Sequence, residues 1–133
     1  MAVTIVRAAL PGGALAHTGL AASGFASGFV HPFGGLDHVL AMFAVGLWAA
    51  RLGGRATWAV PAAFVVVMAA GAAAAVGGLP LPPVEIGVAG SLLVLGAVIA
   101  LDARLSLASA LPLVAVLAVF HGFAHGAEAT GAA

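Results

Sequence analysis

The residues of this sequence that could do chemistry are histidines gathered with acidic residues near two points of the chain. His121, His125 and Glu128 are spaced by four and three residues, so on an α-helix their side chains share one face. Asp37 and His38 form the second cluster. Imidazole suits Ni²⁺, Co²⁺, Zn²⁺ and Cu²⁺, and a carboxylate adds compensating charge or orients an imidazole. The pattern indicates a site for a divalent metal ion.

The two clusters are expected to lie at the same height in a helical protein. With a rise of 1.5 Å per residue, His38 lies about 20 Å from Arg51 and His121 about 25 Å from Arg104 along their helices. If the two helices are neighbours, the clusters therefore build one site. The histidines upstream of the first cluster complete the predicted set of metal ligands: His17, His31, Asp37, His38, His121, His125 and Glu128.

The composition shows which kind of element must position these residues. The chain has 133 residues, of which 64% are hydrophobic and 6% charged, and it has no cysteine. A soluble domain carries about 25% charged residues. The absence of cysteine excludes a disulfide-stapled secreted module. Zero net charge argues against nucleic-acid binding, and the absence of lysine excludes a P-loop nucleotide site. The composition predicts an all-α, polytopic membrane helix bundle.

Long uncharged stretches predict about four transmembrane helices, preceded by a signal-like or interfacial segment. A helix of about 20 apolar residues crosses the hydrocarbon core of a membrane. The breaks at 51–55 and 77–83 are rich in glycine or proline, which end helices, and the third break carries charges. The predicted helices cover residues 33–50, 57–76, 84–101 and 107–127.

The arginines predict the orientation of this bundle. Arg51 and Arg55 lie in the first connection and Arg104 in the third, whereas the second connection has no basic residue. The positive-inside rule places the first and third connections in the cytoplasm, so the histidine clusters face the periplasm. Trp48 and Trp58 flank the first connection, and we expect them to be anchors at the membrane interface.

The N-terminal residues resemble part of a signal peptide. Ala14-Leu15-Ala16 is a small-residue site of the kind that signal peptidase cuts, and cleavage there would leave His17 at the N-terminus. We therefore expect residues 1–16 to be a signal peptide remnant and residues 17–133 to be a single transmembrane domain. The alternative is an uncleaved extension that ends in small residues.

Two runs of the sequence carry a family resemblance. The run HPFGGLDHVLAMFAVG from His31 to Gly46 closely resembles the signature of the HupE/UreJ family of nickel/cobalt permeases. The run FHGFAHGAE, which ends at Glu128, is similar to the later histidine motif of that family. The resemblance covers residues 14–128 and implies Ni²⁺ or Co²⁺ transport across the bacterial inner membrane for hydrogenase or urease maturation. It also implies a cleaved signal peptide.

Family members usually continue into further transmembrane helices after the second motif. We therefore expect this chain to be a shortened or incomplete member. Four helices alone do not readily enclose a path for an ion, which favours a homo-oligomer. The expected partners are the metal ion and the lipid bilayer, without nucleic acid or nucleotide.

The sequence therefore predicts a multi-pass nickel/cobalt permease of the inner membrane rather than an enzyme. No permanently bound cofactor is expected, and the transported ion is Ni²⁺ or Co²⁺, with Zn²⁺ as a further candidate. His17 and His31 would capture the ion, with Glu128 at the mouth. Two alternatives stay open. One is an intramembrane zinc-dependent hydrolase with Asp37 or Glu128 as general base, although no HExxH motif occurs. The other is a metal-binding accessory subunit without transport.

Overall fold

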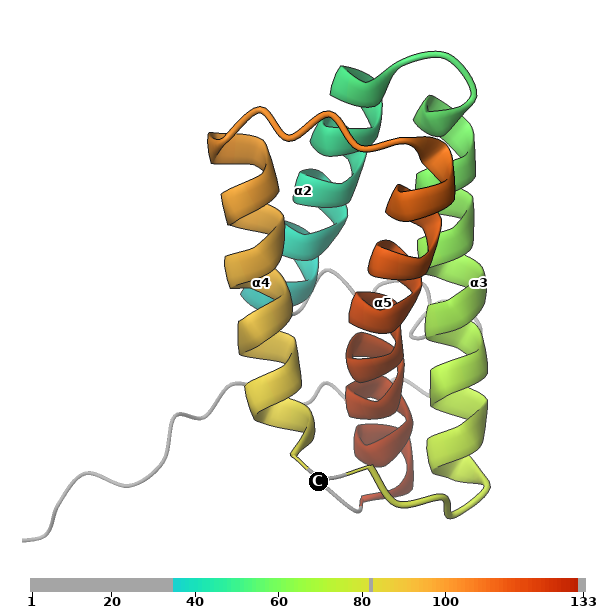
Figure 1. Ribbon diagram of the computed structural model, residues 1–133. Coiled ribbons are helices and arrows are strands. Elements are labelled where there is room, and N and C mark those ends of the chain that lie inside the picture. Colours follow the sequence, from blue (N-terminus) through green and yellow to red (C-terminus); the bar gives the residue numbers. More distant parts are fainter. Residues whose placement is uncertain (1–34, 82, 132–133) are drawn as a thin grey trace, which may run out of the picture. The chain divides into compact units, whose positions relative to one another are not determined.

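The computed structural model describes residues 35–81 and 83–131, which fold into four α-helices (Figure 1). All four helices belong to one compact unit, which begins at Leu36. The described residues contain no strand, so the all-α prediction is confirmed. The predicted boundary after residue 16 lies outside the described residues. The helices are α2 (Leu36–Leu52), α3 (Ala56–Val76), α4 (Val84–Ala100) and α5 (Leu107–Thr130).

The ends of the helices agree with the prediction to within three residues. α2 begins at Leu36, directly after Gly35, and this start places Asp37 in its first turn, where a carboxylate interacts favourably with the helix dipole. Glycine is a poor residue for continuing a helix, because fixing its backbone costs the most entropy. α5 extends to Thr130 and ends at Gly131, whose φ of 68° is the left-handed conformation that commonly terminates helices.

The outer surface of the bundle is apolar. α3 and α5 are each long and apolar enough to cross a membrane, and α4 is a shorter apolar helix. Large apolar side chains point away from the interior, including Phe43, Trp58 and Leu93, which are each about two-thirds or more exposed. Helices that are apolar on all sides belong in lipid or deep in a large core. The described residues therefore form a helical membrane bundle.

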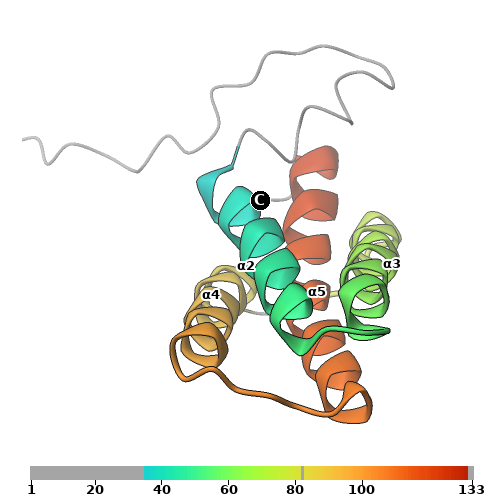
Figure 2. The ribbon, with the colours of Figure 1, turned by 90° about the horizontal axis from the view of Figure 1, so that it is seen from above.

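The packing of the helices places α5 against α3 over most of its length (Figures 1 and 2). α2 contacts α3 and α4, and α4 contacts α5, whereas the backbones of α2 and α5 face each other diagonally with little direct contact. A Cβ atom at Gly122 would collide with the carbonyl oxygen of Met68, and one at Gly126 would lie 2.5 Å from that of Ala72. Small residues allow such close helix contact in membranes. The α3–α5 pair is therefore a rigid support for the side chains of α5.

α2 and α4 each turn one narrow stripe toward the interior. On α2 the stripe runs through His38, Ala41, Val45 and Trp48, which recur every three or four residues. On α4 it consists of Val88, Ser91 and Leu95. The stripes meet in the interior of the bundle. The interior is apolar toward the end that carries Arg51, Arg55 and Arg104, called the arginine-bearing end, and it contains the histidines farther from that end.

Trp48 corrects one expectation from the sequence. The prediction of an interfacial anchor is wrong for this residue, because it is 1% exposed and its Nε1 donates a hydrogen bond of 3.0 Å to the carbonyl oxygen of Ala103. Trp58 is 79% exposed, as an anchor requires. Arg51 donates a second bond, of 2.6 Å, to the carbonyl oxygen of Ile99. The two bonds fasten the end of α2 to the last turn of α4 and to the α4–α5 connection.

We expect Trp48→Phe to lower the free energy of unfolding by about 1–3 kcal/mol, because it removes the bond to Ala103 and leaves a cavity. Trp58→Phe is the matched control and should change stability by less than about 0.5 kcal/mol, since its side chain is exposed. Denaturant unfolding in detergent micelles measures both. Equal losses in the two variants would contradict a core role for Trp48.

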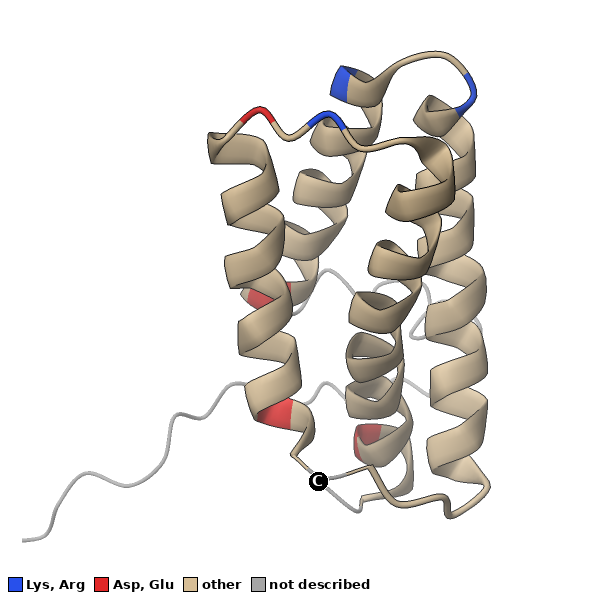
Figure 3. Ribbon diagram, viewed as in Figure 1, with Lys and Arg blue, Asp and Glu red and all other residues tan. Residues whose placement is uncertain are grey.

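The described arginines gather at one end of the bundle (Figure 3). Arg51 is in the last turn of α2, Arg55 precedes α3, and Arg104 lies in the α4–α5 connection. Glu85, in the first turn of α4, lies at the opposite end, whereas α2 begins nearer the middle of the bundle, with Asp37 in its first turn (Figure 1). The structure thus gathers at one end the charges on which the predicted orientation depends.

Candidate metal site

Three histidine side chains from two helices meet inside the bundle. His38 comes from α2, and His121 and His125 come from successive turns of α5. The ring centroids of His38 and His121 are 5.0 Å apart with nearly perpendicular planes, and those of His38 and His125 are 4.0 Å apart. His38 and His121 are buried, and His125 is half-buried. The contacts confirm that the two clusters lie in one layer, although only side chains bridge the diagonal between α2 and α5.

The rings of His38 and His121 each have one nitrogen engaged by a polar neighbour. Nδ1 of His38 lies 3.2 Å from Oδ1 of Asp37, whose side chain is 40% exposed. Nε2 of His121 lies 2.6 Å from Oγ of Ser91, on α4. A hydrogen bond on one nitrogen sets which nitrogen of an imidazole keeps its lone pair. This is the arrangement in which metal-binding histidines are usually held.

The other nitrogen of each ring is left without a hydrogen bond. Nε2 of His38 and Nδ1 of His121 are buried and have no hydrogen-bond partner within the described part of the chain. A buried polar atom without a partner is destabilising by about 1–3 kcal/mol, so such atoms are rare and need an explanation. A cation bound between the two rings would supply the missing partner for both.

The spacing of the rings is close to that of imidazoles on a shared ion. Two imidazoles that bind one metal at about 2.0–2.1 Å have ring centroids roughly 4.5–5 Å apart. The His38–His121 distance of 5.0 Å meets this requirement, and the His38–His125 distance of 4.0 Å is shorter. Within residues 35–81 and 83–131, no three His, Asp or Glu side chains form a complete group of metal ligands. A full coordination shell therefore requires rotation of a ring or a further ligand.

The remaining predicted ligands differ in what the structure says of them. Glu128 is half-buried on α5, one turn beyond His125. Asp37 contacts His38, so its carboxylate is placed to orient that ring. His17 and His31 lie outside the described residues, and their part in the site stays a prediction.

Ser91 is a residue of the site that the sequence analysis missed. Its side chain is 1% exposed and touches His121, which is fully buried. The one available signal was that Ser91 and Glu85 are the only polar residues of α4. That signal marks an inward-facing position, but it does not indicate which histidine the serine meets.

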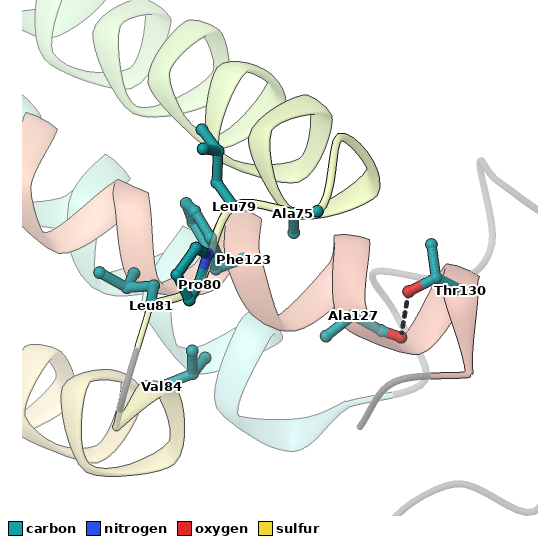
Figure 4. A pocket seen from close by; sticks show the side chains of 9 residues that line it. Ala75, Leu79, Pro80, Leu81, Val84, Phe123, Ala127 and Thr130 are labelled. Atoms are coloured by element: carbon teal, nitrogen blue, oxygen red, sulfur yellow. Dashed lines mark hydrogen bonds between the residues drawn. The ribbon is translucent and has the colours of Figure 1, made fainter.

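An apolar cavity of about 300 Å³ lies beside α5 at the histidine-bearing end (Figure 4). Of the residues that the structure describes, Thr130 contributes the one side-chain hydroxyl to the lining of this cavity, and this hydroxyl donates a hydrogen bond of 3.0 Å to the carbonyl oxygen of Ala127 in its own helix. No described residue that lines the cavity is a histidine or an acid, so the cavity is distinct from the histidine cluster. Its lining consists of Ala75, Gly78, Leu79, Pro80, Leu81, Val84, Phe123, Ala127 and Thr130.

Comparison with known proteins places the chain in a family. The profile of the family described as HupE / UreJ protein matches residues 5–133. Protein HupE of Rhizobium leguminosarum bv. viciae is 47% identical over 125 residues, which are 94% of this chain and 65% of that protein. The chain thus spans just under two thirds of the length of this relative, and no solved structure matches it. Because the profile covers nearly the whole chain and the relative is this similar, the chain belongs to the HupE/UreJ family.

Proposed function

We propose that the chain is part of a nickel/cobalt permease of the bacterial inner membrane that supplies the metal for hydrogenase or urease maturation. The observation that carries this proposal is the histidine cluster inside a membrane bundle. His38 and His121 each offer a buried nitrogen without a hydrogen-bond partner in the described residues, and their rings are spaced for one ion. Borderline nitrogen ligands favour Ni²⁺, Co²⁺ and Zn²⁺ over Mg²⁺ or Ca²⁺.

The proposed route runs from the periplasm toward the arginine-bearing end of the bundle. His17 and His31 capture the ion, and the cluster of His38, His121 and His125 holds it within the membrane. Glu128, near the end of α5, contributes negative charge close to the entrance. Asp37 acts on the ion through His38, because it lies against the ring nitrogen on the other side.

The position of the arginines supports this orientation. The three described arginines lie at the end away from the histidines, where the positive-inside rule places the cytoplasm. The membrane family and the two helices long enough to span support a multi-pass protein. The ion is the transported substrate, so the proposal needs neither a catalytic residue nor a bound cofactor.

Uptake of radiolabelled Ni²⁺ and Co²⁺ into proteoliposomes containing the purified chain tests the proposal. Saturable uptake that a His121→Ala variant lacks is the expected result. Binding of Ni²⁺ without flux would replace the permease by a metal-binding accessory subunit. Turnover of a peptide or lipid with Zn²⁺, and no flux, would favour the hydrolase.

The affinity for Ni²⁺ should fall as the pH is lowered. Metal binds the neutral imidazole, and free histidine titrates near pKa 6.5, so protons compete with the metal at low pH. Between about pH 7.5 and 5.5 the logarithm of the affinity should fall as the pH is lowered, because protons compete with the ion for histidine ligands. Calorimetric titration in detergent measures this slope. A flat profile would mean that carboxylates or backbone carbonyls are the main ligands.

A further inference from the structure

Ser91 occupies an unusual place for a hydroxyl group. It lies on the buried stripe of α4, between Val88 and Leu95, and is 1% exposed. A serine in a membrane helix commonly satisfies itself by bonding to a carbonyl of the preceding turn. Ser91 does so with the carbonyl oxygen of Val88, at 2.7 Å. That bond accounts for its hydrogen but not for its second contact.

The second contact is with His121, across the interface between α4 and α5. The Oγ atom of Ser91 lies 2.6 Å from Nε2 of His121. A serine hydroxyl has one hydrogen to donate and two lone pairs to accept with. When its hydrogen is directed to Val88, the oxygen accepts from His121. In this arrangement Nε2 of His121 carries the proton, and the neutral ring keeps its lone pair on Nδ1.

The same reasoning for His38 gives the opposite nitrogen. The carboxylate of Asp37 accepts from Nδ1 of His38, so the lone pair of the neutral ring lies on Nε2. The two bare nitrogens, Nδ1 of His121 and Nε2 of His38, are among the buried side-chain atoms that have no hydrogen-bond partner in the described residues. Their rings are 5.0 Å apart. Two unrelated neighbours thus leave lone pairs on adjacent rings.

We infer that Ser91 is a positioning residue of the metal site, which holds His121 in the tautomer that offers Nδ1 to the ion while Asp37 makes His38 offer Nε2. The inference rests on the proposed function for the identity of the ligand, a divalent cation of the nickel, cobalt and zinc group. It adds α4 to the helices that build the site. Neither family motif contains Ser91, because it lies on α4, one of the two helices between them.

The test compares Ser91→Ala with Ser91→Thr, which keeps a hydroxyl, and with Ser109→Ala, which removes an exposed hydroxyl at the start of α5. Nitrogen NMR of ¹⁵N-histidine in the metal-free protein reads the tautomer of His121, and a His121→Gln variant assigns its signals. We expect a proton on Nε2 in the wild type and in the Ser91→Thr and Ser109→Ala variants. In Ser91→Ala we expect a mixture of both tautomers.

Calorimetric titration with Ni²⁺ measures the effect on the site. Ser91→Ala should weaken binding by about 10–100-fold, as loss of a partner behind a metal ligand typically does, while the other two variants bind like the wild type. A proton on Nδ1 of His121 in the wild type, or a Ser91→Ala variant with unchanged tautomer and affinity, would overturn the inference. If the wild type binds no Ni²⁺, the proposed function fails, and the NMR result alone still decides whether Ser91 sets the tautomer.

Discussion

Replacing His38 or His121 by alanine should reduce the affinity for Ni²⁺ by at least about 100-fold. Loss of a residue that only hydrogen-bonds to a metal ligand already reduces metal affinity by about 10–100-fold. Both side chains are buried and contact each other, and each has one nitrogen left for the ion. Uptake by proteoliposomes should fall to the level of empty vesicles. Asp37→Asn should have the smaller effect, because Asp37 acts through His38.

The control for these variants is Leu40→Ala, an exposed position on the same turn of α2 as His38. It should bind Ni²⁺ like the wild type. Size-exclusion profiles and helical circular dichroism show whether each variant is folded, which alanine favours as a good helix former. Folded His38→Ala and His121→Ala proteins that accumulate Ni²⁺ at the wild-type rate would show that the cluster is structural.

Gly122→Ala should lower the free energy of unfolding by about 3 kcal/mol or more, at the upper end of the range for overpacking. The added methyl group would collide with the carbonyl oxygen of Met68, and a backbone atom cannot move aside as a flexible side chain can. α3 and α5 would have to separate. Because His121 directly precedes Gly122 in α5, the affinity for Ni²⁺ should fall as well.

Gly96→Ala is the matched control, because nothing lies within 4 Å of a Cβ atom at this exposed position of α4. It should leave stability unchanged or raise it by up to about 1 kcal/mol, the difference in helix propensity between glycine and alanine. Denaturant unfolding in one detergent compares the two variants. Equal stabilities would contradict the close contact between α3 and α5.

The helices themselves follow from the sequence because a membrane requires long uncharged stretches. The absence of charge between Ala56 and Val76 predicts α3 almost to the residue. The rotation of each helix is harder to predict, since a helix that is apolar on every side has no polar face to mark the outside. Trp48 shows the consequence. Its position near a helix end suits an interfacial anchor and a buried core residue equally, and only its burial and its bond to Ala103 in the α4–α5 connection decide between them.

The position of the candidate site along the helices was predictable from the sequence, but the helices that surround it were not. Counting residues along each helix places His38 and His121 in one layer, and the structure agrees. The count does not show that α2 and α5 face each other diagonally, nor that α4 reaches the site through Ser91. Such contacts depend on which helices are neighbours, which no spacing within a single helix records.

The apolar half of the bundle determines where a membrane voltage can act. Val45, Phe64, Leu95 and Val114 are at most 2% exposed and lie between the histidines and the arginine-bearing end. An electric potential falls mainly across such a layer of low dielectric constant. A doubly charged ion gains about 4.6 kcal/mol per 100 mV over the full potential drop. Under the proposed function, the voltage drives the onward step of the ion from the histidines across this apolar layer.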